Sequence, residues 1–568
     1  MLEEVKKDIS EAVAKAIKRA PHEIAALLEI PKDKNLGDFA LPCFKLKTEL
    51  SPDPIAIAKD IYLKLQKPRA IEKIQLAGPY VNFFVDKNYL ASKTIFEILE
   101  LKENFGSGSK KSERVMIEGF GQPNTHKAFH IGHFRNVCLS DALARILRFY
   151  GYDVLTANYF GDIGMHVAKW LWFYLKFYKG KLPKSPTSEW FGKIYTEANK
   201  FYEKHEESHQ EVSNILNKIE FGKDARLKAL WKKTRDSSLK TFSEVYKKIG
   251  VKTDVIFYES KLSKIGKSLT KKLVKEGVAK LDQGAIIVDL KKYGLGVLVL
   301  LKSDGGALYS TRDLALAFQK FTKYKIDKSI YVVAAEQSHY FKQLFKTLEL
   351  AGFKQAKNCH HVPYGLVLLH GKKMASRAGE VVAFEQLFET AKKRAVQEIL
   401  KRNKSLNKKI VDNISEKIAL AALKFAMLKQ SSDKTIDFDL NSMLSFEGET
   451  GPYLLYSLVR ARNILKKARI KIKKNFVPKF EQSYEIDLVK KLCEFREIVS
   501  KAAVQYAPHI IANYAYDLAK CFSEFYENCP VIKEKGDTLQ TRIALVQAFF
   551  YVLRTALNLL GIEEITKM

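Results

Sequence analysis

The sequence has few cysteines, and they form no recognisable framework. The six are Cys43, Cys138, Cys359, Cys493, Cys521 and Cys529. No two of them make a CxxC pair, so we expect neither a disulfide scaffold nor a structural zinc site, and unpaired thiols favour a reducing cytoplasm. His360 and His361 follow Cys359, but adjacent side chains on a strand point to opposite faces. We therefore expect this trio to be structural rather than metal-binding.

Long apolar runs are also absent. No uninterrupted apolar run approaches the length of about 20 residues that a membrane-spanning helix needs. The first ten residues, MLEEVKKDIS, carry acidic side chains and no apolar core, so they match neither a signal peptide nor a transit peptide. We therefore expect a cytoplasmic protein with no membrane partner.

The chain is long, basic and of ordinary globular composition. Its 568 residues are 46% hydrophobic and 28% charged, which predicts several folded domains. The formal net charge of +32 suits a polyanionic partner such as RNA, because neutralised phosphates are the main sequence-independent source of affinity for nucleic acid. The alternative is a lysine-rich surface that only keeps the protein soluble.

The most informative stretch runs from residue 115 to residue 157. Residues 115–117 predict a buried strand, residues 139–150 repeat apolar side chains at helical spacing, and residues 154–157 predict a second strand. This is the pattern of a βαβ unit. His130, Gly132 and His133 lie at its first turn.

The chemistry of this turn points to phosphate. The first N–H groups of a helix and its dipole attract anions, and Gly132 leaves room for a ligand to approach the backbone. His130 and His133 add hydrogen-bond donors, and Lys127 adds a positive charge three residues upstream. Two histidines near a turn also fit an ordinary surface or a metal site, so a second motif is needed to decide.

A second motif lies about 240 residues downstream. Residues 364–369 predict another buried strand, and the basic loop at residues 371–379 follows it. Alone, such a loop is most simply a solvated surface. Together, the HxGH turn and this KMSKS-like loop resemble the signature pair of the class I aminoacyl-tRNA synthetases. The resemblance implies that ATP is a substrate and that the catalytic residues are Lys127, His130, Gly132, His133, Lys373, Met374 and Ser376.

Further positions narrow the resemblance to the arginyl-tRNA synthetases, in which matching residues hold arginine. These positions are Asn124, Tyr309, Asp313 and Gln337. The chemistry agrees, because Tyr309 and Asp313 stand four residues apart on a predicted helix and offer a guanidinium a stacking face and a bidentate acceptor. The alternative is a helix-capping Asp313 and a core Tyr309.

One position departs from the family pattern. The family has a glutamate that contacts the substrate, and alignment on Asn124 without a gap puts Gly119 in its place. Either Glu118 makes this contact through a one-residue bulge, or the contact is lost. We expect Glu118 to serve, because a buried guanidinium needs carboxylate partners.

The KMSKS-like loop departs as well. Lys373 and Met374 match the first Lys and the Met, but Ala375 stands at the first Ser and Ser376 at the second Lys. Many arginyl-tRNA synthetases share this loss and carry a lysine just before HxGH, as Lys127 does here. The two loops are therefore mutually consistent.

Both ends of the chain resemble the tRNA-binding parts of the same family. Residues 35–40 and 78–84 resemble its N-terminal domain, which contacts the tRNA elbow, with Asn82 for a base edge and Phe84 for stacking. A turn residue Asn82 and a core Phe84 are the alternatives. The C-terminal helices resemble its anticodon-binding domain, where stacking on tyrosines is expected. The expected tRNA contacts are Asn82, Phe84, Tyr453, Tyr456, Arg460, Tyr526 and Met568.

These resemblances predict a multidomain α/β protein in three parts. Residues 1–108 are expected to form an N-terminal α+β domain, residues 109–395 a Rossmann-like parallel-sheet catalytic domain, and residues 396–568 an all-α anticodon-binding domain. A helical insertion is expected near residues 167–250, and we assign its aromatic residues to core packing rather than to RNA stacking.

The predicted activity is that of an arginine–tRNA ligase. It would form arginyl-adenylate from ATP and L-arginine with Mg²⁺ and then charge tRNA(Arg), releasing AMP and pyrophosphate. A carboxylate is already a nucleophile, so positioning and electrostatics would carry the rate. The resemblance also implies that activation needs bound tRNA, and we expect a monomer. The alternatives are a synthetase of another specificity, such as the cysteinyl enzyme, whose zinc-ligand pattern is absent here, and a catalytically silent RNA-binding relative.

Overall fold

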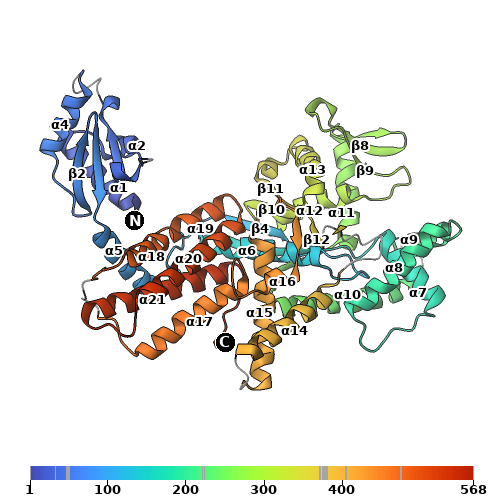
Figure 1. Cartoon of the computed structure of the whole chain (residues 1–568). Helices are drawn as coiled ribbons and strands as arrows, with labels where there is room; N and C mark the ends of the chain where they lie inside the picture. The colour runs from blue at the N-terminus through green and yellow to red at the C-terminus, as the bar shows by residue number, and fades with distance from the viewer. Residues whose placement is uncertain are drawn as a thin grey trace. The chain divides into compact units, whose positions relative to one another are not determined.

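In the computed structural model, the chain forms two compact units. The first comprises Met1–Phe105, Arg460–Arg496 and Asp517–Arg554, and the second comprises Gly106–Val459, Glu497–Tyr516 and Thr555–Met568. The structure describes residues 2–31, 33–46, 52–220, 222, 224–369, 372–373, 382–402, 406–473, 476 and 478–566. Figure 1 labels the helices and strands of both units.

The N-terminal part of the first unit is an α+β module around an antiparallel sheet. Its strands, in the order β1-β3-β2, are β1 (Phe39–Pro42), β3 (Tyr80–Val85) and β2 (Ile71–Ala77). Its helices are α1 (Leu2–Ile17), α2 (Pro21–Leu27), α4 (Pro54–Lys64) and α5 (Lys87–Leu101). Alternate residues of β3, Val81 and Phe83, join Ile9 of α1 in one buried cluster. This module therefore has the α+β class expected for the N-terminal part of the chain.

A five-stranded parallel sheet forms the centre of the second unit. Its order is β11-β10-β4-β5-β6. The strands are β4 (Arg114–Gly119), β5 (Asp153–Phe160), β6 (Val255–Tyr258), β10 (Lys328–Ala334) and β11 (Cys359–Tyr364). The chain runs outward from β4 in one direction and later fills the other side with β10 and β11. The carboxyl ends of β4 and β10 therefore flank a topological switch point, where such sheets bind ligands.

Helix α6 (Ile131–Phe149) joins β4 to β5, as the βαβ pattern predicts. Four helices are then inserted between β5 and β6: α7 (Met165–Phe177), α8 (Ser188–Lys204), α9 (Ser208–Glu220) and α10 (Ala225–Ile249). Trp170, Trp172 and Tyr174 are buried in one cluster of this insertion. The assignment to core packing is therefore confirmed for these three residues, whereas Phe177 at the end of α7 is 47% exposed.

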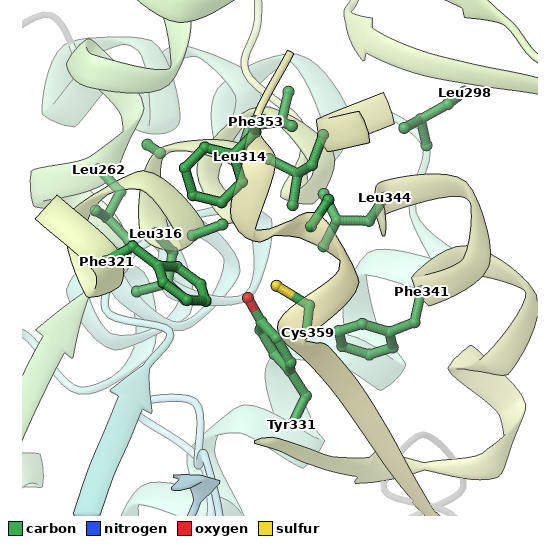
Figure 2. Packing of buried hydrophobic residues seen from close by; sticks show 14 of the residues in the cluster. Leu262, Leu298, Leu314, Leu316, Phe321, Tyr331, Phe341, Leu344, Phe353 and Cys359 are labelled. Carbon is green, nitrogen blue, oxygen red and sulfur yellow. The ribbon is translucent and has the colours of Figure 1, made fainter. Parts of the chain in front are cut away.

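The second half of the sheet is packed against a large apolar cluster (Figure 2). It lies among α11 (Glu259–Lys275), α12 (Tyr309–Lys323), α13 (Ser338–Leu350) and the small sheet of β7 (Lys280–Asp282), β8 (Ala285–Asp289) and β9 (Val297–Leu301). Figure 2 shows the sulfur of Cys359 beside the hydroxyl of Tyr331 in this core. His360, the next residue along β11, is exposed, so the expected alternation of this segment is confirmed.

The predicted strand at residues 364–369 is wrong as a single element. Tyr364 ends β11, and a separate strand, β12 (Val367–Leu369), pairs with β13 (Lys372–Lys373) and β14 (Ile436–Phe438). The break falls at Gly365, where a Cβ would lie 2.5 Å from the carbonyl oxygen of Lys434. The KMSKS-like loop therefore starts from this smaller sheet.

The remaining elements are mostly helices, as expected for the C-terminal part of the chain. They are α14 (Phe384–Arg402), α15 (Lys408–Leu428), α16 (Leu440–Met443), α17 (Gly451–Ala468), α18 (Ser483–Cys493), α19 (Phe495–Val504), α20 (Pro508–Asn528) and α21 (Gly536–Leu559). Short 3₁₀ turns are η1 (Lys34–Leu36), η2 (Cys43–Lys45), η3 (Lys102–Asn104), η4 (Lys291–Tyr293), η5 (Ala335–Gln337) and η6 (Lys354–Asn358). Within the described ranges, no helix is long and apolar enough to cross a membrane.

The close approach of α11 and α12 generates a stability prediction. A Cβ on Gly266 of α11 would overlap the carbonyl oxygen of Thr311 on α12. We expect Gly266→Ala to push the helices apart and to lower the midpoint of thermal unfolding, at a cost of about 1–3 kcal/mol. The control is Lys271→Ala on the exposed side of α11, which should melt like the wild type. A Gly266→Ala protein with an unchanged midpoint would contradict the tight contact.

Candidate active site

The loop that leaves β4 is held by polar side chains of α6. Three consecutive residues have left-handed backbone, with φ of 60° at Phe120, 93° at Gly121 and 47° at Gln122. Ser140 Oγ accepts the N–H of Phe120 at 3.1 Å, and Asn136 Oδ1 accepts the N–H of Gly121 at 2.7 Å. The path of the chain from β4 to the HxGH turn is therefore specified by α6 itself.

The strand β4 has no bulge at Glu118. β4 pairs with β5 residue for residue up to Gly119, where a Cβ would overlap Ser140 Oγ. The Glu118 side chain is 4% exposed; its Oε1 accepts a hydrogen bond from Gln122 at 2.8 Å, and its Oε2 forms an ion pair with the fully buried Lys320. The carboxylate is therefore occupied by protein partners, and Gly119 has no room for a glutamate in its place.

His130 and His133 form a stacked, hydrogen-bonded pair at the start of α6. His130 Nδ1 accepts the N–H groups of Gly132 at 3.1 Å and of His133 at 3.4 Å, and His133 Nδ1 accepts the N–H of His130 at 3.2 Å. The ring centroids are 3.6 Å apart. Because each Nδ1 accepts, each neutral ring carries its proton on Nε2. Burial, reinforced by the charge of Lys127, lowers the pKa of His130 to about 4.

This arrangement corrects the expected phosphate contact. The N–H groups of Gly132 and His133 are taken by His130, and the N–H of Ile131 is bonded to the carbonyl of Val382 at 3.4 Å. A Cβ on Gly132 would lie 3.0 Å from His130 Cε1, so this glycine makes room for the imidazole. The donors that the turn offers to a phosphate are therefore the two Nε2–H groups.

A cleft of about 960 Å³ is lined by Asn124 and Lys127, which precede this turn, and by Tyr309 among others. Lys127 Nζ is 4.4 Å from the centroid of the Tyr195 ring, and its charge helps to lower the pKa of both signature histidines. Asn124 is bridged to Gly161 at the end of β5, where a Cβ would overlap the Asn124 Oδ1. The cleft thus brings together residues predicted for arginine and for phosphate.

The first turn of α12 carries the predicted guanidinium receptor. Tyr309 is 59% exposed, and Asp313 follows one turn later. The helix cap is Leu308, and the Asp313 Oδ2 instead accepts the hydroxyl proton of Tyr340 at 2.5 Å. The shared helix face is confirmed, and the capping alternative is wrong. Gln337 lies exposed at the end of β10, three residues before Tyr340.

The sequence did not point to several buried groups around this receptor. Burial raises the pKa of Asp313 to about 7; the Tyr340 hydrogen bond opposes this shift, and the charge of Glu118 adds to it. Glu259, the first residue of α11, is buried against Arg312, and burial raises its pKa to about 7 as well. The one signal available for Glu259 was its position directly after the apolar segment that forms β6.

The predicted tRNA contacts of the N-terminal module are only partly accessible. Asn82 and Phe84 lie on the face of β3 opposite the core residues, so neither the turn nor the core alternative is correct. Phe84 is half-buried with Lys73 Nζ 5.2 Å from its ring centroid. Asn82 is 3% exposed, which leaves its amide little access to a base.

The C-terminal candidates lie on helices, as predicted. Tyr453, Tyr456 and Arg460 recur at helical spacing on α17, and all three are half-buried. The Arg460 guanidinium is 4.8 Å from the ring centroid of Tyr526, which is exposed.

For four of the predicted site residues, the structure describes no side chain. Met374, Ser376 and Met568 lie outside the described residues, and the structure describes only the backbone of Lys373, in β13.

A parallel sheet whose central strand leads into a helix that begins with a stacked histidine pair is the arrangement of a class I aminoacyl-tRNA synthetase catalytic domain. The family described as "tRNA synthetases class I (R), catalytic domain" matches residues 94–441. The "Arginyl tRNA synthetase N terminal domain" matches residues 3–85, and the "DALR anticodon binding domain" matches residues 454–568.

Individual relatives agree along the whole chain. The arginine–tRNA ligase of Clostridium acetobutylicum is 36% identical over 571 residues, covering 99% of this chain and 100% of the relative. That of Bdellovibrio bacteriovorus is 36% identical, covering 96% and 94%. The solved arginyl-tRNA synthetase of Thermus thermophilus superposes with a TM-score of 0.80 at 28% identity, covering 99% and 100%. The chain belongs to the arginine–tRNA ligase family, and the cysteinyl alternative is therefore wrong.

The hydrogen bonds of the histidine pair generate a prediction about protonation. We expect His130 to stay neutral, with its proton on Nε2, between about pH 5 and pH 8, because its pKa is near 4 and its Nδ1 is an acceptor. ¹⁵N-histidine NMR reports both properties, and a His130→Gln variant assigns the resonance. A titration near the ordinary histidine pKa, or a proton on Nδ1, would contradict the geometry.

Proposed function

We propose that the cleft beside the stacked histidines carries out the arginine–tRNA ligase reaction. The enzyme uses ATP to activate L-arginine to arginyl-adenylate and then transfers arginine to the 3′ end of tRNA(Arg), with release of pyrophosphate and AMP. The observation that carries the residue assignment is that one cleft joins Lys127 and Asn124 to Tyr309, one turn before the half-buried Asp313.

Arginine binds with its guanidinium at the first turn of α12. Asp313 accepts two of its N–H groups, and the exposed ring of Tyr309 covers its face. Tyr340 holds the carboxylate of Asp313 in place through the 2.5 Å hydrogen bond. Asn124 and Gln337 contact the other end of the substrate. Glu118 is reassigned to an indirect role, because its carboxylate is already paired with Lys320.

The carboxylate of arginine attacks the α-phosphate of ATP without a general base. Charge that develops on the phosphates is stabilised by the Nε2–H groups of His130 and His133 and by Lys127, which are in place before the reaction. Lys373 of the KMSKS-like loop supplies a second cation, and Met374 and Ser376 belong to the same loop. The terminal hydroxyl of tRNA then attacks the adenylate, while the same groups hold AMP.

Mg²⁺ enters with ATP, held by the phosphate oxygens. Across the described residues, no three His, Cys, Asp or Glu side chains converge as a metal-binding group. No step is therefore assigned to a metal held by the protein.

The tRNA is held by the two end domains of the chain, residues 1–108 and residues 396–568. Phe84 stacks at the elbow, and Tyr453, Tyr456, Arg460 and Tyr526 contact the anticodon arm. Aromatic rings and a guanidinium are suitable for unstacked bases, and the net charge of +32 favours phosphate binding. The enzyme acts as a monomer in the cytoplasm; its six unpaired thiols are consistent with that compartment.

Arginine-dependent ATP–pyrophosphate exchange tests this assignment. With wild-type enzyme, we expect exchange only with arginine and only with tRNA(Arg) present. Asp313→Ala should raise the KM for arginine roughly 100-fold and leave the KM for ATP within about twofold, because it removes a buried partner of one charge. Asp304→Ala is the matched control, since this carboxylate lines the same cleft. Equal losses for both substrates in Asp313→Ala would count against the assignment.

The raised pKa of Asp313 generates a pH prediction. Since guanidinium binds the carboxylate form, arginine affinity should fall about tenfold per pH unit below about pH 7. Tyr340→Phe removes the hydrogen bond that lowers this pKa, so the fall should begin at higher pH. Calorimetric titration of arginine between about pH 6 and pH 8 measures it, with Tyr293→Phe as a distant control.

Glu259 titrates in the same range, but its partner is Arg312 and not Tyr340. A Tyr340→Phe curve that coincides with the wild type would therefore rule out Asp313 as the titrating group.

A further inference from the structure

Arg135 is a fully buried cation on α6, two residues after His133. It donates four hydrogen bonds, all to backbone carbonyls. NH1 reaches the oxygens of Gly365 at 2.9 Å and Leu366 at 2.8 Å, and NH2 reaches those of Ser432 at 3.0 Å and Lys434 at 2.6 Å. Among the described residues no carboxylate forms an ion pair with it. Burial lowers the pKa of Arg135 to about 10, so it remains charged at neutral pH.

The four carbonyls belong to the short segments that lead into two paired strands, which we call the roots of these strands. Residues 365 and 366 lead directly into β12, and residues 432 and 434 lead into β14. The two roots are in close contact, because the N–H of Gly365 is bonded to the carbonyl of Ser432 at 2.8 Å and the N–H of Ile436 to that of Leu366 at 2.9 Å. β12 then pairs with β13, and Leu368 of β12 lies opposite Lys373 of β13. Arg135 thus stabilises the position of the sheet that carries Lys373.

The far end of the same segment is attached to the HxGH turn as well. Ala383 forms an antiparallel bridge with His130, and the N–H of Phe384 is bonded to the carbonyl of Phe129 at 3.0 Å. The backbone on both sides of the KMSKS-like loop is therefore anchored on the segment 129–135. His130 makes one anchor and Arg135 makes the other, on either side of His133.

We propose that Arg135 is a positioning residue that sets the distance between Lys373 and the two signature histidines during adenylate formation. The inference rests on the proposed phosphate roles of Lys373, His130 and His133. Arg135 itself touches no substrate; it acts through the backbone of β12 and β13.

The chemistry explains why the position carries an arginine. A buried cation is costly unless its donors are satisfied, and four of the five N–H groups of this planar guanidinium bind two pairs of carbonyls on different segments, while the Nε–H has no partner in the part of the chain that the structure describes. A lysine has the charge but only one nitrogen, so it cannot reach both roots. An apolar side chain would leave four buried carbonyls with fewer partners. The arginine is thus suited to joining these two roots at a fixed spacing.

The test is a double-mutant cycle in ATP–pyrophosphate exchange with tRNA(Arg) present. Arg135→Lys alone should lower kcat about tenfold and raise the KM for ATP, because a small displacement of a phosphate-binding group is costly. The dissociation constant for arginine, measured by calorimetry, should stay within about twofold. In a Lys373→Ala background the same substitution should have little further effect, because the group that it displaces is already gone. Arg148→Lys, on the same helix but bonded to Val154, is the matched control.

The outcomes distinguish a failure of the proposed role of Lys373 from a failure of the proposed role of Arg135. If Lys373→Ala alone has normal ATP kinetics, the proposed role of Lys373 fails, and this inference falls with it. If Lys373→Ala is impaired but the two losses multiply, or if arginine affinity falls as much as ATP affinity, Arg135 is only structural. Should Arg135→Lys not fold, Gly365→Ala disturbs the same joint from the other side, since its Cβ would meet the carbonyl of Lys434. That variant should give the same coupling to Lys373.

Discussion

The buried backbone groups around α6 must find hydrogen-bond partners, and this requirement organises the active site. Side chains of the helix itself meet it: His130 and His133 cap the first turn, Asn136 and Ser140 hold the loop that leaves β4, and Arg135 holds the roots of β12 and β14. A helix in a parallel α/β fold usually offers an apolar face. Here polar groups on that face fix three separate chain segments relative to one another, because each bond is made in a buried environment where a lost partner is costly.

The same burial sets the ionisation of the site. Removing water disfavours charge, so it lowers the pKa of His130 and raises the pKa values of Asp313 and Glu259. The histidines are consequently neutral donors throughout the physiological range, and their protonation does not compete with phosphate binding. The carboxylates are less strongly charged when the cleft holds no cation. In the proposed function, an arriving guanidinium restores their charge, so substrate binding and carboxylate ionisation are coupled.

Local pattern was sufficient to predict much of the catalytic core. The buried strand β4, the periodic helix α6 and the spacing of Tyr309 and Asp313 are properties of short segments, and the structure has them where the sequence indicates. Contacts between distant segments were not predictable. Lys320 stands on an amphipathic helix and reads as a solvated lysine, yet it is buried because Glu118 lies on the neighbouring strand. Nothing in the sequence indicated a role for Tyr340, because its partner Asp313 is 27 residues away.

The position of Glu118 shows how the register of a strand and the conformation of the following loop depend on each other. Relative to the family pattern, one extra residue separates Glu118 from Asn124, and it had to be accommodated in the strand or in the loop. A bulge in β4 would have turned side chains that are buried on both faces of the sheet, so the strand register is strongly specified. The loop takes the extra residue instead, at the cost of left-handed backbone at Phe120 and Gln122 that α6 and β5 help to stabilise. Glu118 therefore keeps its place in the strand, where its charge acts on the ionisation of Asp313.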